Sequence, residues 1–130
     1  RLIPGVSKEA VRDYYAMTDL GLVTLRDKAL FRTVLPSKVF ELMAMGRPIL
    51  CTVQGECRAL LAEAGAAVFV EPEDTDGMAE AILKLRGDAD LRRRMSDSGR
   101  TFVCARFDRN RLAMAYLGLL ERLSKEHGGS

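Results

Sequence analysis

The chain has 130 residues, of which 48% are hydrophobic and 29% charged, and these values fit one globular domain with a real core. A formal net charge of only +2 gives no indication of a strong polyanion partner, so nucleic acid binding is not expected. The three scattered cysteines form no C-x-x-C pair, which predicts reduced thiols in the cytoplasm and no zinc site. No membrane span or signal peptide is visible in the sequence.

The first residues in chain order look like the end of a strand, followed by a helix. The sequence starts at Arg1 without a methionine, and residues 2–5 have the strand-end pattern, so we interpret it as part of a longer protein. Ser7 is placed to cap a helix over residues 8–17. The apolar side of this helix is predicted to comprise Val11, Tyr14 and Tyr15.

Strands and helices then alternate with short connections. Three apolar runs have the pattern of buried parallel strands, at residues 20–25, 48–52 and 66–70. The connections are a charged loop over 26–34, a helix over 36–46, and a helix over 55–64 that ends at Gly65. This order predicts an α/β domain with a parallel sheet and flanking helices.

The last part of the chain is predicted to be all helix. Asp74, Asp88 and Asp108 are each placed to cap a helix, the first of which covers residues 75–85. The apolar positions of the three helices are Met78, Ala81, Ile82 and Leu85, then Leu91, Met95, Phe102 and Val103, then Leu112, Tyr116, Leu119, Leu120 and Leu123. From Glu126 onward we expect the end to fray.

The helix that follows the charged loop carries the most informative pattern. Pro36 suits its first position, and Gly46 ends it because glycine tolerates the left-handed cap. Ser37, Lys38 and Glu41 are spaced three and four apart and therefore share one face. The side chains predicted to face the core are Val39, Phe40, Met43 and Ala44.

An anion at the start of this helix would meet free N–H groups, the positive end of the helix dipole, the Ser37 hydroxyl and the Lys38 ammonium. One turn further along, Glu41 offers acceptors suited to a sugar diol. The motif lies with residues 52–56 and 71–74 at the carboxyl ends of the predicted strands, where open α/β sheets bind ligands. Two interpretations stay open: a nucleotide-sugar site, and an amphipathic helix with a solvated Lys–Glu pair.

Basic residues gather around the same helix, an excess that suits a small phosphate ligand better than nucleic acid. They are Arg26, Lys28, Arg32, Lys38 and Arg47. Arg26 or Arg32 either reaches the phosphates or stays solvated, and Glu56 either contacts the ligand or caps its own helix. A second basic group, residues 92–94 with Arg100, is interpreted as a solvated or interface face.

Several segments in a fixed order resemble a known family. They are residues 19–23 (Asp-Leu-Gly-Leu-Val), the run 36–48 from Pro36 to Pro48, Gly65, residues 70–72 (Val-Glu-Pro) and the pair Gly99-Arg100. Together they look like family 4 glycosyltransferases, and more closely like the bacterial group that builds O-antigen, capsule and related surface polysaccharides. The resemblance extends from Val6 to Leu123. It implies the C-terminal, Rossmann-like half of a GT-B enzyme, the half that holds the nucleotide-sugar donor.

The resemblance also implies roles for single residues. Glu41 matches the second of two family glutamates, which hydrogen-bonds the ribose, whereas the first, a donor-sugar contact, falls at the non-acidic Thr33. Ser37 and Lys38 match a variant of transferases that use N-acetylated amino sugars. The expected nucleotide-sugar-binding residues are Arg32, Thr33, Leu35, Pro36, Ser37, Lys38 and Glu41. The family's catalytic Arg and Lys fall upstream of Arg1.

The implied reaction moves a sugar from a nucleotide diphosphate donor, expected to be UDP-linked, to a hydroxyl of a glycan or lipid-linked acceptor. It proceeds with retention and without a metal or cofactor, in the cytoplasm or at the inner face of the plasma membrane. Residues 1–107 are expected to form an incomplete donor domain, and residues 108–130 a helix that packs on an N-terminal domain. The alternatives are a non-catalytic α/β interaction module that docks through its last helix, and a GT-B nucleotide-sugar epimerase.

Overall fold

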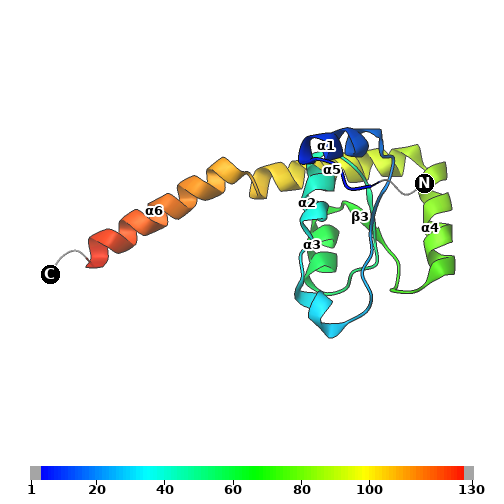
Figure 1. Ribbon diagram of the computed structural model, residues 1–130, viewed down its shortest axis with the longest axis horizontal. Helices are drawn as coiled ribbons and strands as arrows, with labels where there is room; N and C mark the ends of the chain where they lie inside the picture. The colour runs from blue at the N-terminus through cyan, green and yellow to red at the C-terminus, as the bar shows by residue number, and fades with distance from the viewer. Residues whose placement is uncertain (1–3, 128–130) are drawn as a thin grey trace.

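The computed structural model describes residues 4–127, which form a three-stranded parallel sheet with flanking helices and one long helix that projects away (Figure 1). In chain order the elements are α1 (Lys8–Met17), β1 (Gly21–Val23), the 3₁₀ helix η1 (Ala29–Thr33), α2 (Ser37–Ala44), β2 (Ile49–Cys51), α3 (Glu56–Ala64), β3 (Ala67–Phe69), α4 (Thr75–Gly87), α5 (Ala89–Arg106) and α6 (Arg109–His127). The predicted α/β class is confirmed.

The sheet has the order β1-β2-β3, with both pairs parallel. Gly21 is in register with Ile49, and Ile49 with Ala67. A helix lies in each connection, as parallel neighbours require. Each strand is three residues long and lies inside the longer apolar run that predicted it.

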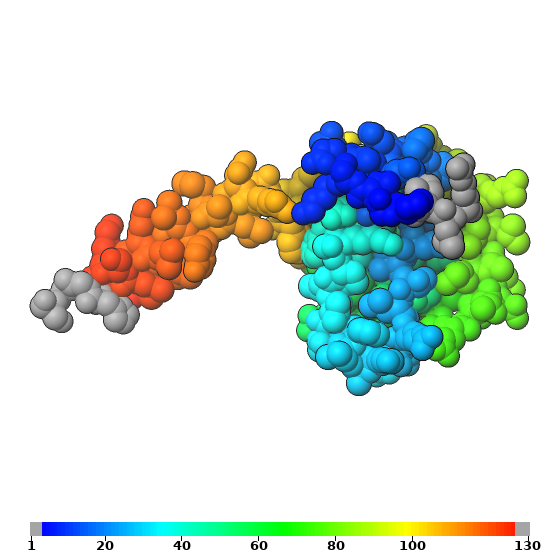
Figure 2. Space-filling view, in the orientation of Figure 1, coloured from blue at the N-terminus to red at the C-terminus, as the bar shows by residue number. Residues whose placement is uncertain are grey.

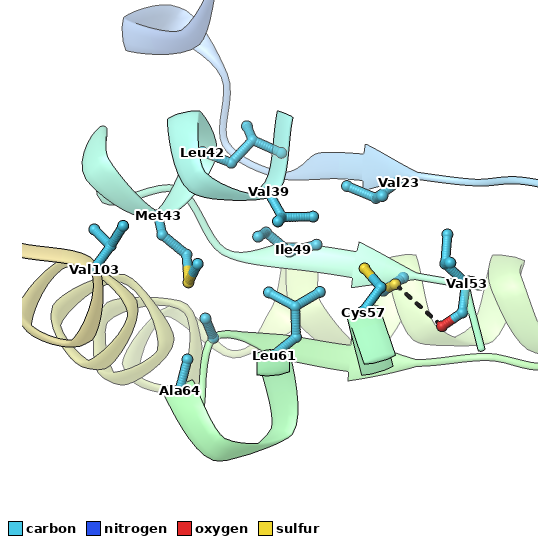
Figure 3. Packing of buried hydrophobic residues seen from close by; sticks show 12 residues of the cluster. Val23, Val39, Leu42, Met43, Ile49, Val53, Cys57, Leu61, Ala64 and Val103 are labelled. Carbon is cyan, nitrogen blue, oxygen red and sulfur yellow. Dashed lines mark hydrogen bonds between the residues drawn. The ribbon is translucent and has the colours of Figure 1, made fainter. Parts of the chain in front are cut away.

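The larger core lies on the face of the sheet that α2, α3 and α5 cover. Met43 of α2, Leu61 of α3 and Val103 of α5 point into it, and each is almost completely buried (Figure 3). The middle residue of β2, Leu50, points to the opposite face, where Ala81 of α4 packs against it. The central strand is therefore buried on both sides, as its unbroken apolar run predicted.

The four predicted helix caps are confirmed. In each case a side-chain oxygen accepts a hydrogen bond from the backbone N–H three residues further along the chain. The pairs are Ser7 with Ala10 at 3.3 Å, Asp74 with Gly77 at 2.9 Å, Asp88 with Leu91 at 2.8 Å and Asp108 with Arg111 at 2.9 Å.

The start and the buried face of α2 differ from the prediction. Pro36 is the N-cap and the helix begins at Ser37, whereas Gly46 follows the helix with a φ of 61°, as expected. Ala44 is exposed, and Leu42 is buried in its place. Leu42 fits against the sheet because Gly21 has no side chain: a Cβ there would lie 2.5 Å from the Leu42 Cδ1.

Several other local predictions are wrong. Tyr14 and Ile82, predicted to face inward, are exposed because α1 and α4 each have only part of their apolar side against the sheet. Pro4 and Gly5 form no strand, and residues 2–3 lie outside the described residues. The charged loop contains η1. Of the end that was expected to fray, Glu126 and His127 still belong to α6, and residues 128–130 lie outside the described residues.

The last helix leaves the body of the molecule. α6 extends well beyond the sheet and its flanking helices (Figures 1 and 2). Its large exposed apolar side chains include Leu112, Met114, Tyr116, Leu117, Leu119 and Leu120. None of the helices in the described residues is both long and apolar enough to cross a bilayer.

Candidate functional site

The exposed face of α2 carries the three polar residues of the predicted motif. Ser37, Lys38 and Glu41 are all exposed. The Lys38 ammonium reaches back to the carbonyl of Leu22 in β1, with Nζ 3.5 Å from the oxygen. The amides of Ser37 and Lys38 stand in the first turn, where a helix offers no backbone acceptor for them. The start of α2 therefore offers both N–H donors and a cation to an anion.

Glu41 has a partner that the motif did not predict. The Tyr15 hydroxyl, from α1, donates a hydrogen bond to Glu41 Oε2 at 2.9 Å. Burial, followed by this bond and the negative charge of the carboxylate, raises the pKa of Tyr15 to about 12. The phenol therefore stays protonated at neutral pH and acts as the donor. The Glu41 carboxylate is therefore held by Tyr15, a residue of α1 that lies 26 positions earlier in the chain.

A groove runs along this pair of side chains between α1 and α2. It has a volume of about 460 Å³, and its polar lining comprises Tyr15, Glu41, Lys8, Arg12 and Arg109. Among the described residues, none forms an ion pair with Lys8, Arg12 or Arg109. Three cations and one carboxylate in one groove suit a ligand that carries both phosphate and hydroxyl groups.

A second groove adjoins the first at Tyr15. It has a volume of about 240 Å³ and is lined by Tyr15, Lys38 and the strand residues Gly21 and Leu22. Tyr15 belongs to both linings, so it stands between the groove that Glu41 lines and the groove that Lys38 lines, beside β1 at the edge of the sheet.

In the loop before α2, Arg32 and Thr33 bond to other residues of the same loop. Arg32 Nη2 lies 3.3 Å from Asp27 Oδ1 in an exposed ion pair, and the Thr33 hydroxyl donates to the Leu30 carbonyl at 3.3 Å. Leu35 is exposed. The structure does not bring Arg32 or Thr33 into contact with Glu41.

At the carboxyl edge of the sheet, where we expected an open ligand site, the space between the loops that follow β1 and β2 is nearly closed. The cavity there has a volume of only about 10 Å³, which is room for about one water molecule, whereas a groove of about 400 Å³ between β3 and α4 includes Glu71 and Asp74 in its lining. Gln54 Nε2 and Arg58 Nη1 each lie 3.0 Å from a carboxylate oxygen of Glu71, which ties two edge loops together. Glu56 is exposed, and its side chain does not cap α3. The predicted alternative in which Glu56 caps its own helix is therefore wrong.

Two arginines counted among the basic groups have structural roles. Arg47 follows α2 at the amino end of β2, where its guanidinium donates to the carbonyls of Thr18 at 3.0 Å and Met45 at 3.1 Å. It therefore lies just past the end of α2, where its guanidinium holds backbone carbonyls. Arg92, interpreted as part of a solvated face, donates to the carbonyls of Leu85 and Arg86 and so caps the end of α4.

The cysteines are all free thiols. Cys51 and Cys57 are buried in the main core, where Cys51 Sγ lies 3.7 Å from the Val53 carbonyl (dashed line in Figure 3), whereas Cys104 is exposed. The hydrogen bond with Cys51, together with burial, raises the pKa of the Cys57 thiol. In the part of the chain that the structure describes, no three His, Cys, Asp or Glu side chains are grouped to hold a metal ion.

Sequence reasoning missed Tyr15 and the cations of the groove. It assigned Tyr15 to the apolar side of its helix. One signal was present, because Lys8, Arg12 and Tyr15 are spaced four and three apart and so line one face of α1. No local pattern could have identified Arg109, which reaches the groove from the start of α6.

Comparison with protein families matches residues 2–88 of this chain to the family described as glycosyl transferases group 1. The match covers more than half of the chain and includes α1, α2 and all three strands. The small parallel sheet with flanking helices is consistent with half of a GT-B fold. No curated protein sequence matches the chain.

Proposed function

We propose that this chain, which belongs to the group 1 glycosyl transferases, binds the nucleotide diphosphate sugar donor on the surface between α1, β1 and α2. Membership of the family gives the chain a role in glycosyl transfer, with a sugar donor and an acceptor as substrates. The donor-binding assignment is the finer step, and it rests on the side chains of this surface.

The observation that carries the proposal is the position of Glu41. Its exposed carboxylate opens into a groove whose other charged groups are cations, Lys8, Arg12 and Arg109. A ribose needs hydrogen-bond acceptors for its hydroxyls, and the attached phosphates need cations or N–H donors close by. We assign the ribose hydroxyls to Glu41.

We assign the diphosphate to the start of α2. Ser37 and Lys38 lie one helical turn before Glu41, which is about 5 Å along the axis. Leu35 and Pro36 set the direction in which the chain enters this turn. When the sugar–phosphate bond breaks, negative charge grows on the diphosphate, and fixed N–H groups with the Lys38 ammonium would stabilise it. These groups allow a mechanism that needs no metal ion.

The donor sugar would lie toward the loop before α2. We propose Thr33 and Arg32 as its neighbours, with Thr33 in the place of the usual glutamate. For these two residues the ligand would have to replace the present contacts, with Leu30 and Asp27. The proposed reaction retains the configuration at the anomeric carbon and uses a UDP-linked hexose or N-acetylated amino sugar.

The protein as a whole would be a two-domain GT-B enzyme of surface-polysaccharide synthesis. Residues 1–107 would serve as the donor side of its cleft, and the helix in 108–130 would pack on an N-terminal domain that supplies the catalytic Arg and Lys. The exposed leucines of α6 support this arrangement, since they need an apolar partner. The acceptor would be a glycan or a lipid-linked sugar at the inner face of the plasma membrane.

Calorimetry with UDP tests the donor assignment, with GDP and ADP measured beside it. Replacing Glu41 by alanine should weaken binding of the preferred nucleotide by about 1.5–3 kcal/mol, the scale of a hydrogen bond to a charged group. Glu80→Ala is the matched control, because Glu80 is an exposed carboxylate on α4, across the sheet. Equal affinities for Glu41→Ala and the unmodified chain would remove Glu41 from the ribose role, and no binding of any nucleotide would favour an interaction module.

A further inference from the structure

We propose that Tyr15 and Glu41 act as one receptor for the ribose cis-diol, with Tyr15 as the residue that makes the site select a ribonucleotide over its 2′-deoxy analogue. This inference rests on the proposed donor-binding function and adds a second helix to the site. It concerns a residue outside the α2 motif.

The Tyr15–Glu41 pair offers one hydrogen-bond acceptor to each of two ligand hydroxyls. The Tyr15 proton is directed to Glu41 Oε2 at 2.9 Å, so Oε1 is the oxygen left for a ligand donor. The Tyr15 oxygen, having donated its proton, keeps its lone pairs as acceptors. Two neighbouring hydroxyls of one ribose then donate to the pair, the 3′-hydroxyl to Glu41 Oε1 and the 2′-hydroxyl to Tyr15 Oη.

Tyr15 is also better fixed than the carboxylate that it contacts. Its ring packs against the main core, whereas Glu41 is exposed. An exposed glutamate samples several rotamers, and ordering it on binding costs conformational entropy. The bond from Tyr15 orders the carboxylate before the ligand arrives, which favours binding of a diol with a defined geometry.

The state of protonation agrees with this arrangement. The pKa of Tyr15 is raised to about 12, so the hydroxyl keeps its proton throughout the neutral range. The other charged groups that line the groove on α1 and α6 are cations, Lys8, Arg12 and Arg109, and these do not compete for the Tyr15 proton.

The expected result is a change in the ratio of the affinity for UDP to the affinity for 2′-deoxy-UDP. With both acceptors present, loss of the 2′-hydroxyl leaves one of them unsatisfied, and we expect the unmodified chain to prefer UDP to 2′-deoxy-UDP by about tenfold. In Tyr15→Phe the second acceptor is absent, so the preference should fall to about twofold, with UDP itself bound about fivefold more weakly.

Calorimetry of both nucleotides with the full chain tests this. Tyr14→Phe is the matched control, because Tyr14 is the adjacent residue on α1, is exposed and makes no side-chain hydrogen bond in the described residues. A circular dichroism spectrum confirms that each variant is folded. The control should keep both affinities and their ratio.

The ratio separates a receptor from a merely structural role. If Tyr15 only holds α1 in place, Tyr15→Phe will weaken UDP and 2′-deoxy-UDP equally, and the unchanged ratio would overturn the inference. If Glu41→Ala abolishes binding while Tyr15→Phe changes nothing, the donor site stands and the paired receptor falls. If the unmodified chain binds neither nucleotide, both fall.

Discussion

At the scale of single residues, the hydroxyl of Tyr15 connects α1 to the proposed site, and its titration gives a direct test of that contact. Because its pKa is raised to about 12 in the folded chain, above the ordinary value near 10, folding is favoured by this group below pH 10. That contribution is lost as the pH rises through the folded pKa.

We therefore expect an ultraviolet titration of phenolate formation to contain one late step, near pH 12, that belongs to Tyr15. The step should vanish in Tyr15→Phe and move toward the ordinary range in Glu41→Gln, which removes the negative charge. A midpoint for Tyr15 that is the same in the unmodified chain and in Glu41→Gln would show that the hydroxyl does not contact the carboxylate.

A second residue-scale prediction concerns Gly55, the N-cap of α3. Its φ is 72°, and a Cβ on it would lie 2.0 Å from the backbone oxygen of Arg32. Neither atom can move aside easily, because both belong to the backbone. Gly55→Ala should lower the free energy of unfolding by about 1–3 kcal/mol or more, measured by urea denaturation.

The control for this substitution is Gly87→Ala, where nothing lies within 4 Å of the added atom and φ is not positive. It should be neutral or should stabilise the chain by up to about 1 kcal/mol, because alanine favours helix over glycine. Equal effects of the two substitutions would mean that the loop carrying Arg32 does not pack on Gly55.

At the scale of elements, local chemistry was enough to locate the helices. The Asp and Ser caps predicted where α1, α4, α5 and α6 begin, because each cap bonds a backbone group only three residues away. Strand limits were less accurate, since they depend on where a neighbouring strand diverges. The buried face of α2 was partly wrong for the same reason: Leu42 is buried because Gly21, 21 positions earlier, leaves it space.

In the proposed site, too, some features follow from local sequence and others depend on residues far apart in the chain. Ser37, Lys38 and Glu41 could be grouped from helical spacing alone. The contact between Tyr15 and Glu41 depends on how α1 packs beside α2, and no local sequence pattern predicts that packing. The contacts at the carboxyl edge were equally out of reach, because they join the loops after β2 and β3 through Gln54 and Glu71.

The exposed apolar side of α6 leads to a prediction about association. If another domain covers this side in the complete enzyme, a preparation of the present chain alone should self-associate as its concentration rises, which light scattering can measure. Leu120→Lys, in the middle of the apolar stripe, should reduce the association. Met114→Lys, on the opposite side of the helix by its spacing, should not.

A scattering mass that stays at the 14.4 kDa of a monomer at every concentration would contradict this prediction. Equal effects of Leu120→Lys and Met114→Lys would also contradict it, because they would show that the apolar stripe has no special role.

At the scale of the whole molecule, the proposed site occupies one side of the domain, beside β1 at the edge of the sheet. α4 covers the opposite face, and α6 leaves from the same side as α1 and α2 (Figure 1). Arg109, at the start of α6, lines the groove itself. A domain that covered α6 would therefore also stand next to the proposed donor site.

The proposed site between α1 and α2 can be tested by an NMR titration of the labelled chain with UDP. We predict that the largest amide shifts fall on Ser37, Lys38, Glu41 and Tyr15. Shifts confined to the carboxyl-edge loops at residues 52–56 and 71–74, or the absence of shifts with any nucleotide, would show that no nucleotide diphosphate binds between α1 and α2.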